Sequence, residues 1–126
     1  MTTPEGRVKA DVSKVLNQLL SMGDILYWTR MQSGQFKVDK CYVHACEPGT
    51  FDLLAVFPDK KKNLCVAFIE LKRADRPAFL SDSQKAFKAK YDGKHANILF
   101  WLVQSAAEVR TLIRKHGYDR LKDVEL

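Results

Sequence analysis

The chain has 126 residues, of which 46% are hydrophobic, and it carries a formal net charge of +6. This length suits one domain over residues 1–126 with a single core, and the composition excludes a disordered, collagen-like or low-complexity chain. No apolar run approaches the roughly 18 to 20 residues that a membrane span needs, and no basic flank leads into an apolar stretch at the start. We therefore expect no membrane contact and no signal peptide. The three cysteines are an odd count, which favours reduced thiols and a cytoplasmic protein.

The positive charge is concentrated in one segment, from Lys60 to His95. That segment holds ten lysines and arginines against four acids, and the difference equals the net charge of the whole chain. A localised positive field attracts polyanions such as nucleic acids. Charge alone does not distinguish such a surface from one that only keeps the protein soluble.

The first predicted element is a helix over residues 3–22. Thr3 is a suitable cap, Pro4 suits the first helical position, and Gly23 is a suitable stop. Apolar residues recur at helical spacing and predict one buried face, formed by Val8, Val12, Val15, Leu16, Leu19 and Leu20.

Strands are predicted next. Residues 25–31 and a less regular segment over 36–43 flank a turn signal at Ser33-Gly34, which indicates a pair of strands. The apolar runs 51–57 and 64–71 flank a second turn and predict a hairpin whose second strand is largely buried.

The rest of the chain alternates between helix and strand. Residues 73–80 predict a loop, followed by a helix over 82–91 that is capped by Ser81 and has Ala86, Phe87 and Tyr91 facing inward. A buried strand over 97–103 and a helix opened by a capping box at 105–108 complete the pattern. The order predicts a mixed α/β fold.

Two acids and a lysine form the main candidate site. Asp52 opens the first strand of the hairpin, and Glu70 and Lys72 lie at the far end of the second. Glu70 interrupts a buried strand, and a buried carboxylate is costly unless it is paired or binds a metal. Glu70 and Lys72 are two residues apart and project from one face, and the hairpin brings Asp52 beside Glu70.

This combination suits a divalent metal ion. Asp52, Glu70 and the backbone carbonyl of Leu71 are candidate ligands for Mg²⁺, with water and a phosphate oxygen in the remaining positions. Such an ion activates water and stabilises charge on a phosphodiester, and Lys72 is placed to orient that water or to stabilise the developing charge. The alternative is a plain salt bridge between Glu70 and Lys72.

An ordered set of motifs resembles a known family. Gly49-Thr50-Phe51-Asp52, Ile69-Glu70-Leu71-Lys72 and Ser81-Asp82-Ser83-Gln84 resemble the PD-(D/E)xK nuclease superfamily, and most closely its VRR-NUC family. The opening residues 3–9 are similar to the first helix of the short, stand-alone phage and bacterial members. The match spans residues 3 to about 103; Glu-x-Lys alone is common by chance, whereas the ordered set is much more specific.

The resemblance implies a restriction-endonuclease-like core, with a mixed central sheet flanked by helices, and a Mg²⁺ or Mn²⁺ site. It implies hydrolysis of branched DNA such as Holliday junctions by a homodimer, in the host cytoplasm if the protein is phage-encoded. The site residues that it implies are the metal ligands Asp52 and Glu70, the catalytic lysine Lys72, Gln84 from the second helix and Glu5 from the first. The segment 39–46 is longer and more hydrophilic than this pattern leads us to expect before the Gly-x-x-Asp element.

The contacts to DNA are expected on the basic segment. Lys85 and Lys88 are three residues apart on the helix that carries Gln84, and Arg73 and Arg76 follow the Glu-x-Lys element. The lysines over 60–62 lie at the opposite end of the hairpin and are expected to matter less.

Other candidates have less support. Cys41, His44, Cys46 and Cys65 match no closed zinc motif and are expected to be ordinary thiols and a histidine. Tyr27 and Trp28 are candidates for stacking on bases, whereas Trp101 is expected in the core and His95 and His116 at the solvated surface.

Three functions are therefore compared. The first is a metal-dependent endodeoxyribonuclease that selects its DNA by structure. The second is a nucleic-acid-binding module with a nuclease fold that does not cut, and the third is a ribonuclease that uses the same site. The complete set of Asp52, Glu70 and Lys72 favours an enzyme over the non-cutting module.

Overall fold

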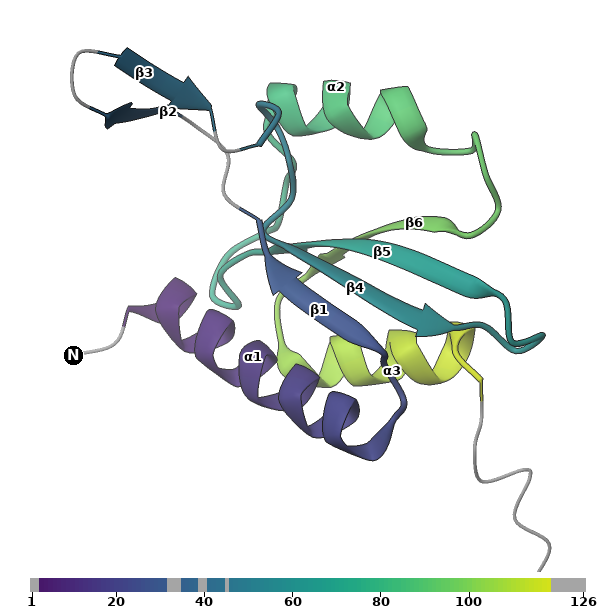
Figure 1. Ribbon diagram of the computed structural model, residues 1–126. Helices are drawn as coiled ribbons and strands as arrows, with labels where there is room; N and C mark the ends of the chain where they lie inside the picture. The colour runs from purple at the N-terminus through teal and green to yellow at the C-terminus, as the bar shows by residue number, and fades with distance from the viewer. Residues whose placement is uncertain (1–2, 32–34, 39–40, 45, 119–126) are drawn as a thin grey trace, which may run out of the picture.

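A mixed four-stranded sheet with helices on both faces forms the centre of the molecule (Figure 1). In order across the sheet the strands are β1 (Tyr27–Arg30), β4 (Leu53–Pro58), β5 (Leu64–Leu71) and β6 (Ile98–Val103). β4 is antiparallel to both β1 and β5, whereas β5 and β6 are parallel. Helices α1 (Pro4–Met22) and α3 (Ala106–His116) pack together on one face, and α2 (Asp82–Tyr91) lies over the other (Figure 1). The predicted mixed α/β class is confirmed.

The structure is a computed structural model that describes residues 3–31, 35–38, 41–44 and 46–118, with the backbone alone for 35–38 and 41–44. Within these residues β2 (Gln35–Val38) and β3 (Cys41–His44) form a separate two-stranded hairpin. The predicted pairing of residues 25–31 with 36–43 is therefore wrong, because β1 pairs with β4 instead. Pairing with β4 adds β1 to the sheet whose buried face forms the core, and Trp28 of β1 packs against that core. The predicted turn at 33–34 lies outside the described residues.

Helix α1 forms as its sequence predicts. The Thr3 hydroxyl accepts a hydrogen bond of 3.0 Å from the Gly6 N–H, and Gly23 ends the helix in the left-handed conformation with φ 82°. The apolar stripe turns toward the sheet and buries Val8, Val12, Leu16 and Leu19. Leu20, which was expected on the same face, is 41% exposed. None of the helices within the described residues is long and apolar enough to cross a membrane.

The predicted hairpin is confirmed as β4 and β5, and its two faces are buried to different degrees. Side chains toward α1 and α3, such as Phe57 and Ile69, are fully buried, whereas their neighbours toward α2 are half-buried. Phe68 stacks on Phe100 at 5.2 Å, and Phe87 of α2 covers this pair. Since one short helix covers this face, it stays partly open. Ala86 was expected to face inward but is exposed, whereas Tyr91 packs edge-on against Phe87 with ring centroids 5.2 Å apart and stays 38% exposed.

The last strand and helix also lie where the sequence predicts them. Ser105 caps α3 through a 3.3 Å hydrogen bond from the Glu108 N–H, but the Glu108 carboxylate accepts from the Gln104 N–H and leaves the capping box half formed. Trp101 is buried as expected. His116 departs from its predicted solvated position, because its ring stacks on Trp101 with centroids 5.7 Å apart.

Candidate active site

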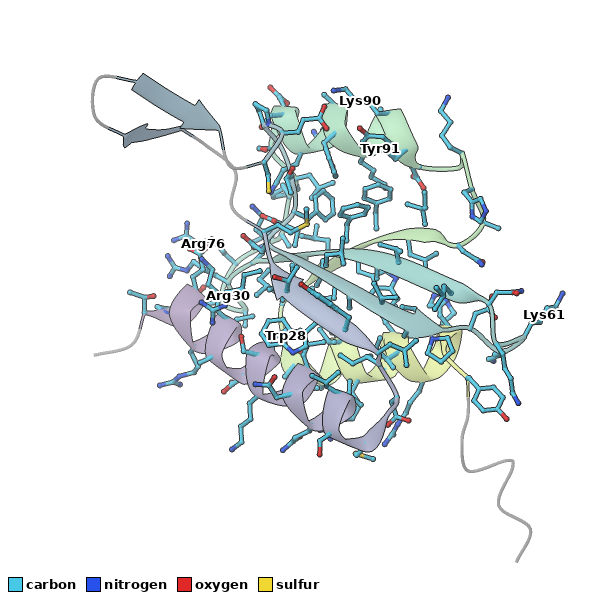
Figure 2. The ribbon with its side chains drawn as sticks, viewed as in Figure 1. Trp28, Arg30, Lys61, Arg76, Lys90 and Tyr91 are labelled. Atoms are coloured by element: carbon cyan, nitrogen blue, oxygen red, sulfur yellow. The ribbon has the colours of Figure 1, made fainter. Side chains whose placement is uncertain are left out.

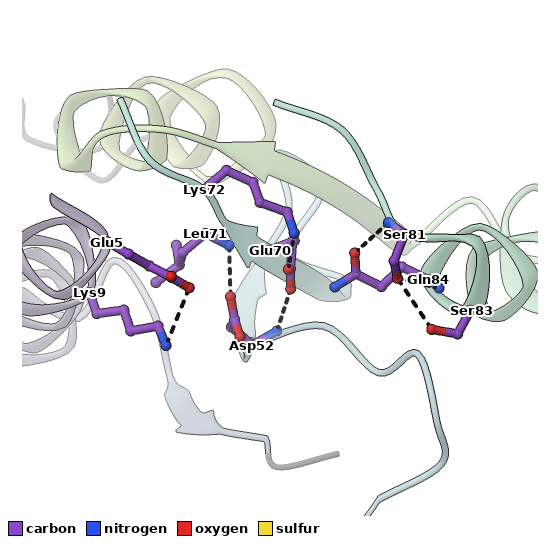
Figure 3. Close-up of polar contacts among 9 residues, drawn as sticks. All are labelled: Glu5, Lys9, Asp52, Glu70, Leu71, Lys72, Ser81, Ser83 and Gln84. Atoms are coloured by element: carbon purple, nitrogen blue, oxygen red, sulfur yellow. Dashed lines mark hydrogen bonds and ion pairs between the residues drawn. The ribbon is translucent and has the colours of Figure 1, made fainter. Parts of the chain in front are cut away.

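Asp52 and Glu70 meet at one end of the hairpin. The register pairs Leu53 with Ile69, so Asp52, one residue earlier, lies opposite Glu70. The Asp52 N–H donates to Glu70 Oε1 at 3.1 Å, and the Leu71 N–H donates to Asp52 Oδ2 at 3.0 Å (Figure 3). The hairpin therefore brings the two predicted acids together.

Lys72 completes this group of charges. Its Nζ lies 3.1 Å from Glu70 Oε2. The Glu70 side chain is 6% exposed and that of Lys72 is 30% exposed, so the ammonium reaches solvent and the carboxylate does not. Burial raises the pKa of the Glu70 carboxyl, the Asp52 charge raises it further, and polar contacts from Gln84 and Lys72 oppose these effects. Burial and the nearby Asp52 charge thus disfavour the ionised form of Glu70, and a bound cation would stabilise it.

Helix α2 delivers Gln84 to the other side of Glu70. The Ser81 hydroxyl accepts from the Gln84 N–H at 3.2 Å, and Gln84 Oε1 accepts from the Ser81 N–H at 2.9 Å, which is a complete capping box. Figure 3 shows the remaining nitrogen of the Gln84 amide pointing toward Glu70. One buried side chain therefore caps the helix and lines the site.

The loop before Asp52 is fixed to α2 by a close backbone approach. Gly49 has φ +85°, and a Cβ at this position would lie 2.1 Å from the Ser83 carbonyl oxygen. The Glu47 carboxylate accepts hydrogen bonds from Lys90 and from the Tyr91 hydroxyl, also on α2. The glycine in Gly-x-x-Asp is thus required by the packing of this loop on the helix that carries Gln84.

A second set of polar residues borders Asp52 on the α1 side and was missed from the sequence. A cavity of about 170 Å³ beside Asp52 is lined by Lys9 of α1 and Arg30 of β1. Arg30 Nη2 donates to Ser13 Oγ at 3.2 Å, which ties β1 to α1. No local sequence signal placed these cations at the site, because the position of Arg30 depends on the pairing of β1 with β4 and that of Lys9 on the packing of α1 against the sheet.

The other predicted residues lie at the edge of the site. Glu5 forms an ion pair of 3.6 Å with Lys9, and within the described part of the chain it makes no hydrogen bond or ion pair with Asp52 or Glu70. Arg73 is bound by Asp75 through a 2.9 Å hydrogen bond from its Nε. This pairing leaves Arg76 as the more accessible arginine of the loop.

Gln104 holds this basic loop in place and was also missed. Its Nε2 donates to the carbonyl oxygens of Arg73 at 2.9 Å and Arg76 at 2.7 Å. Gln104 directly follows β6, next to the end of β5, so its contact with the loop depends on the parallel pairing of these strands.

The side chains that are expected to contact nucleic acid differ in their exposure and in whether they already have a partner. Lys85 is exposed on α2, whereas Lys88 forms an ion pair with Asp92 at 3.6 Å. Tyr27 is 48% exposed, but Trp28 is half-buried and donates from Nε1 to Asn17 at 3.0 Å. Lys85 and Tyr27 are thus the accessible members of the two pairs.

The donor atoms at the site suit a hard cation. Two carboxylates and the Leu71 carbonyl supply oxygens, which Mg²⁺ and Mn²⁺ prefer, and such ions retain several waters. Across the described ranges no group of three or more histidine, cysteine or acidic side chains is placed to hold a metal, so the proposed set has two side-chain ligands. Cys46 and Cys65 are free, and the side chains of Cys41 and His44 lie outside the described residues.

Comparison of the chain with protein-family models, curated proteins and solved structures found no match. The chemistry of the site is therefore inferred from its own groups. Paired carboxylates beside an ammonium, with further cations at the rim, are suited to metal-assisted attack on a phosphate ester.

Proposed function

We propose that the protein is a metal-dependent nuclease that hydrolyses phosphodiester bonds in DNA. The observation that carries the proposal is the convergence of Asp52, buried Glu70 and Lys72 at one end of the β4–β5 hairpin. A mixed sheet flanked by helices is compatible with the PD-(D/E)xK core that the ordered motifs resemble, and VRR-NUC membership belongs to the same proposal.

Asp52, Glu70 and the Leu71 carbonyl would hold the metal ion. A bound Mg²⁺ or Mn²⁺ supplies Lewis-acid stabilisation of the phosphate and lowers the pKa of a coordinated water. Asp52 Oδ2 and Glu70 Oε1 each accept a backbone N–H, which fixes both carboxylates before any ligand binds. The protein thus orients its metal ligands in advance.

Lys72 is the group assigned to the reacting phosphate. Glu70 Oε2 holds its ammonium in place, and the side chain is exposed enough to meet a substrate. From that position Lys72 orients the attacking water or stabilises the charge that develops on the phosphate. The Gln84 amide nitrogen points toward Glu70 from the other side (Figure 3), where it would help to hold the carboxylate in place.

The cations around the site suit a polyanionic substrate. Lys9 and Arg30 border Asp52 on one side, and Lys85 lies on α2 on the other. Contacts of this kind bind the backbone of any nucleic-acid sequence. A preference for branched DNA, action as a homodimer and a cytoplasmic setting complete the proposal, on the strength of the motif resemblance and the reduced thiols.

A substrate panel tests the proposal. The protein would be incubated with linear, flapped and four-way DNA and with matched RNA, in Mg²⁺, in Mn²⁺ and in excess chelator. We expect metal-dependent cleavage of DNA, fastest on the branched forms. Cleavage of RNA alone would instead show a ribonuclease, and tight binding without cleavage in either metal would show a non-cutting module.

A further inference from the structure

A basic cavity lies at the end of the hairpin opposite to the candidate active site. Its volume is about 480 Å³. Figure 2 shows Lys61 at this end and Arg30 and Arg76 at the other. β5 has eight residues, so the two ends are separated by about 25 Å. The polar and charged residues that line the cavity are Asp59, Lys60, Lys61, Asn63, Asn97, Lys115 and His116.

The hairpin turn that carries two of these lysines is held rigidly. Asp59 Oδ1 accepts from the backbone N–H groups of Lys61 and Asn63, each at 2.9 Å. Lys62 takes the left-handed conformation with φ 67°, which closes the turn. Lys60 and Lys61 therefore extend from a fixed backbone.

The end of α3 is attached to this turn. Asp59 forms a β-bridge with Gly117, and the Tyr118 N–H donates to the Pro58 carbonyl at 2.8 Å. A Cβ on Gly117 would lie 2.4 Å from the Ile113 carbonyl oxygen. Only a glycine therefore allows the backbone to pass so close to the last turn of α3. Lysines from two distant segments are thus held around one cavity.

Among the described residues that line the cavity, positive charges outnumber negative ones. Within the described residues Lys60, Lys61 and Lys115 form no ion pair. The Asp59 carboxylate, which lines the same cavity and accepts the two turn N–H groups, offsets one of their three charges. Burial lowers the pKa of His116, and the charges of Lys115 and Lys60 lower it further, so the fields of both lysines reach its ring. The half negative charge of the α3 C-terminus favours Lys115 but is too small to offset all three lysines.

We propose that this cavity binds phosphoryl groups. Three ammonium groups supply the charge, the side-chain amides of Asn63 and Asn97 supply neutral donors, and the volume accommodates a diphosphate or a nucleotide. The rigid turn means that little ordering is needed when the ligand arrives. This site is separate from Asp52 and Glu70, and it does not depend on the nuclease proposal.

Titration with inorganic pyrophosphate, followed by NMR of the full chain, tests the site. We expect shifts of the His116 ring and of the Asn63 and Asn97 side-chain amides, with saturation. The variant Lys60→Ala/Lys115→Ala should bind about tenfold more weakly, because each exposed charge contributes modestly. The absence of saturable shifts at these three residues would overturn the proposal.

A matched variant and a second ligand complete the design. Lys14→Ala/Arg114→Ala removes the same charge from exposed positions that do not line the cavity, and it should bind pyrophosphate like the unchanged protein. An equal loss in this control would mean that net charge alone attracts the anion, which contradicts a site. If a short oligonucleotide produces the same shifts and competes with pyrophosphate, the phosphoryl group belongs to nucleic acid; shifts with pyrophosphate alone identify a free anion. Either result supports the site.

Discussion

Replacing Gly49 by alanine should weaken the packing of the loop before Asp52 against α2. The residue has φ +85°, and the new Cβ would lie 2.1 Å from the Ser83 carbonyl oxygen. The left-handed conformation costs alanine about 1–2 kcal/mol, and displacing a packed backbone adds about 1–3 kcal/mol. Reduced freedom of the unfolded chain returns about 0.4–1 kcal/mol, which leaves a net loss of about 2–4 kcal/mol.

Gly93→Ala is the control, since Gly93 has φ +76° and nothing within 4 Å of its virtual Cβ. Only the conformational term applies there, for a net loss of about 0.5–1 kcal/mol. With a urea m-value of about 1.5 kcal/mol/M, the unfolding midpoint should fall by about 1–3 M for Gly49→Ala and by about 0.5 M for the control. Equal shifts would refute the close approach of the Gly-x-x-Asp loop to α2.

Three further predictions concern charged residues. Lys72→Ala should reduce cleavage by orders of magnitude while Mg²⁺ affinity stays the same or rises, which turnover and metal titration on the same variant would measure. Intact turnover with lower stability would instead mean that Lys72 only forms a salt bridge with Glu70. Because the pKa of Glu70 is raised in the folded state, its contribution to stability is full below the ordinary glutamate pKa of 4.5 and is lost as pH rises through the folded-state pKa. In the absence of metal, the unfolding free energy of Glu70→Gln should therefore increase relative to that of the unchanged protein from about pH 4.5 upward. Urea titrations that show the same difference at every pH would exclude this. Lys85→Ala/Lys88→Ala should weaken binding to all DNA sequences and lower the salt slope of log affinity by about one to two units, whereas Lys14→Ala should change it little; equal slopes for both variants would place the DNA elsewhere.

Local patterns in the sequence were sufficient to predict most elements. The cap at Thr3, the stop at Gly23 and the capping box of Ser81 and Gln84 are short-range signals, and each forms as expected. The hairpin that joins Asp52 to Glu70 was predictable for the same reason, because its turn and its two apolar runs are contiguous.

Long-range pairing was not predictable in this way. The local turn signal predicts that residues 25–31 pair with the next strand along the chain, but β1 pairs with β4 instead. This pairing brings Arg30 beside Asp52. The bridge between Asp59 and Gly117 likewise brings Lys115 to the hairpin turn. Such contacts depend on how the faces of the sheet and the helices pack against one another in the core. That packing cannot be predicted from any single segment of the sequence.

The most direct test of the central claim compares cleavage by the unchanged protein with cleavage by Asp52→Asn. Both would be incubated with a four-way DNA junction in Mg²⁺ under single-turnover conditions, after circular dichroism has shown that both are folded. Asparagine keeps the size of the side chain and an oxygen that accepts from the Leu71 N–H, but it removes the charge that the metal needs. The account predicts Mg²⁺-dependent cutting by the unchanged protein and a loss of at least about a hundredfold in the variant. Equal cutting by the two proteins would contradict the assignment of Asp52 and Glu70 as the metal site.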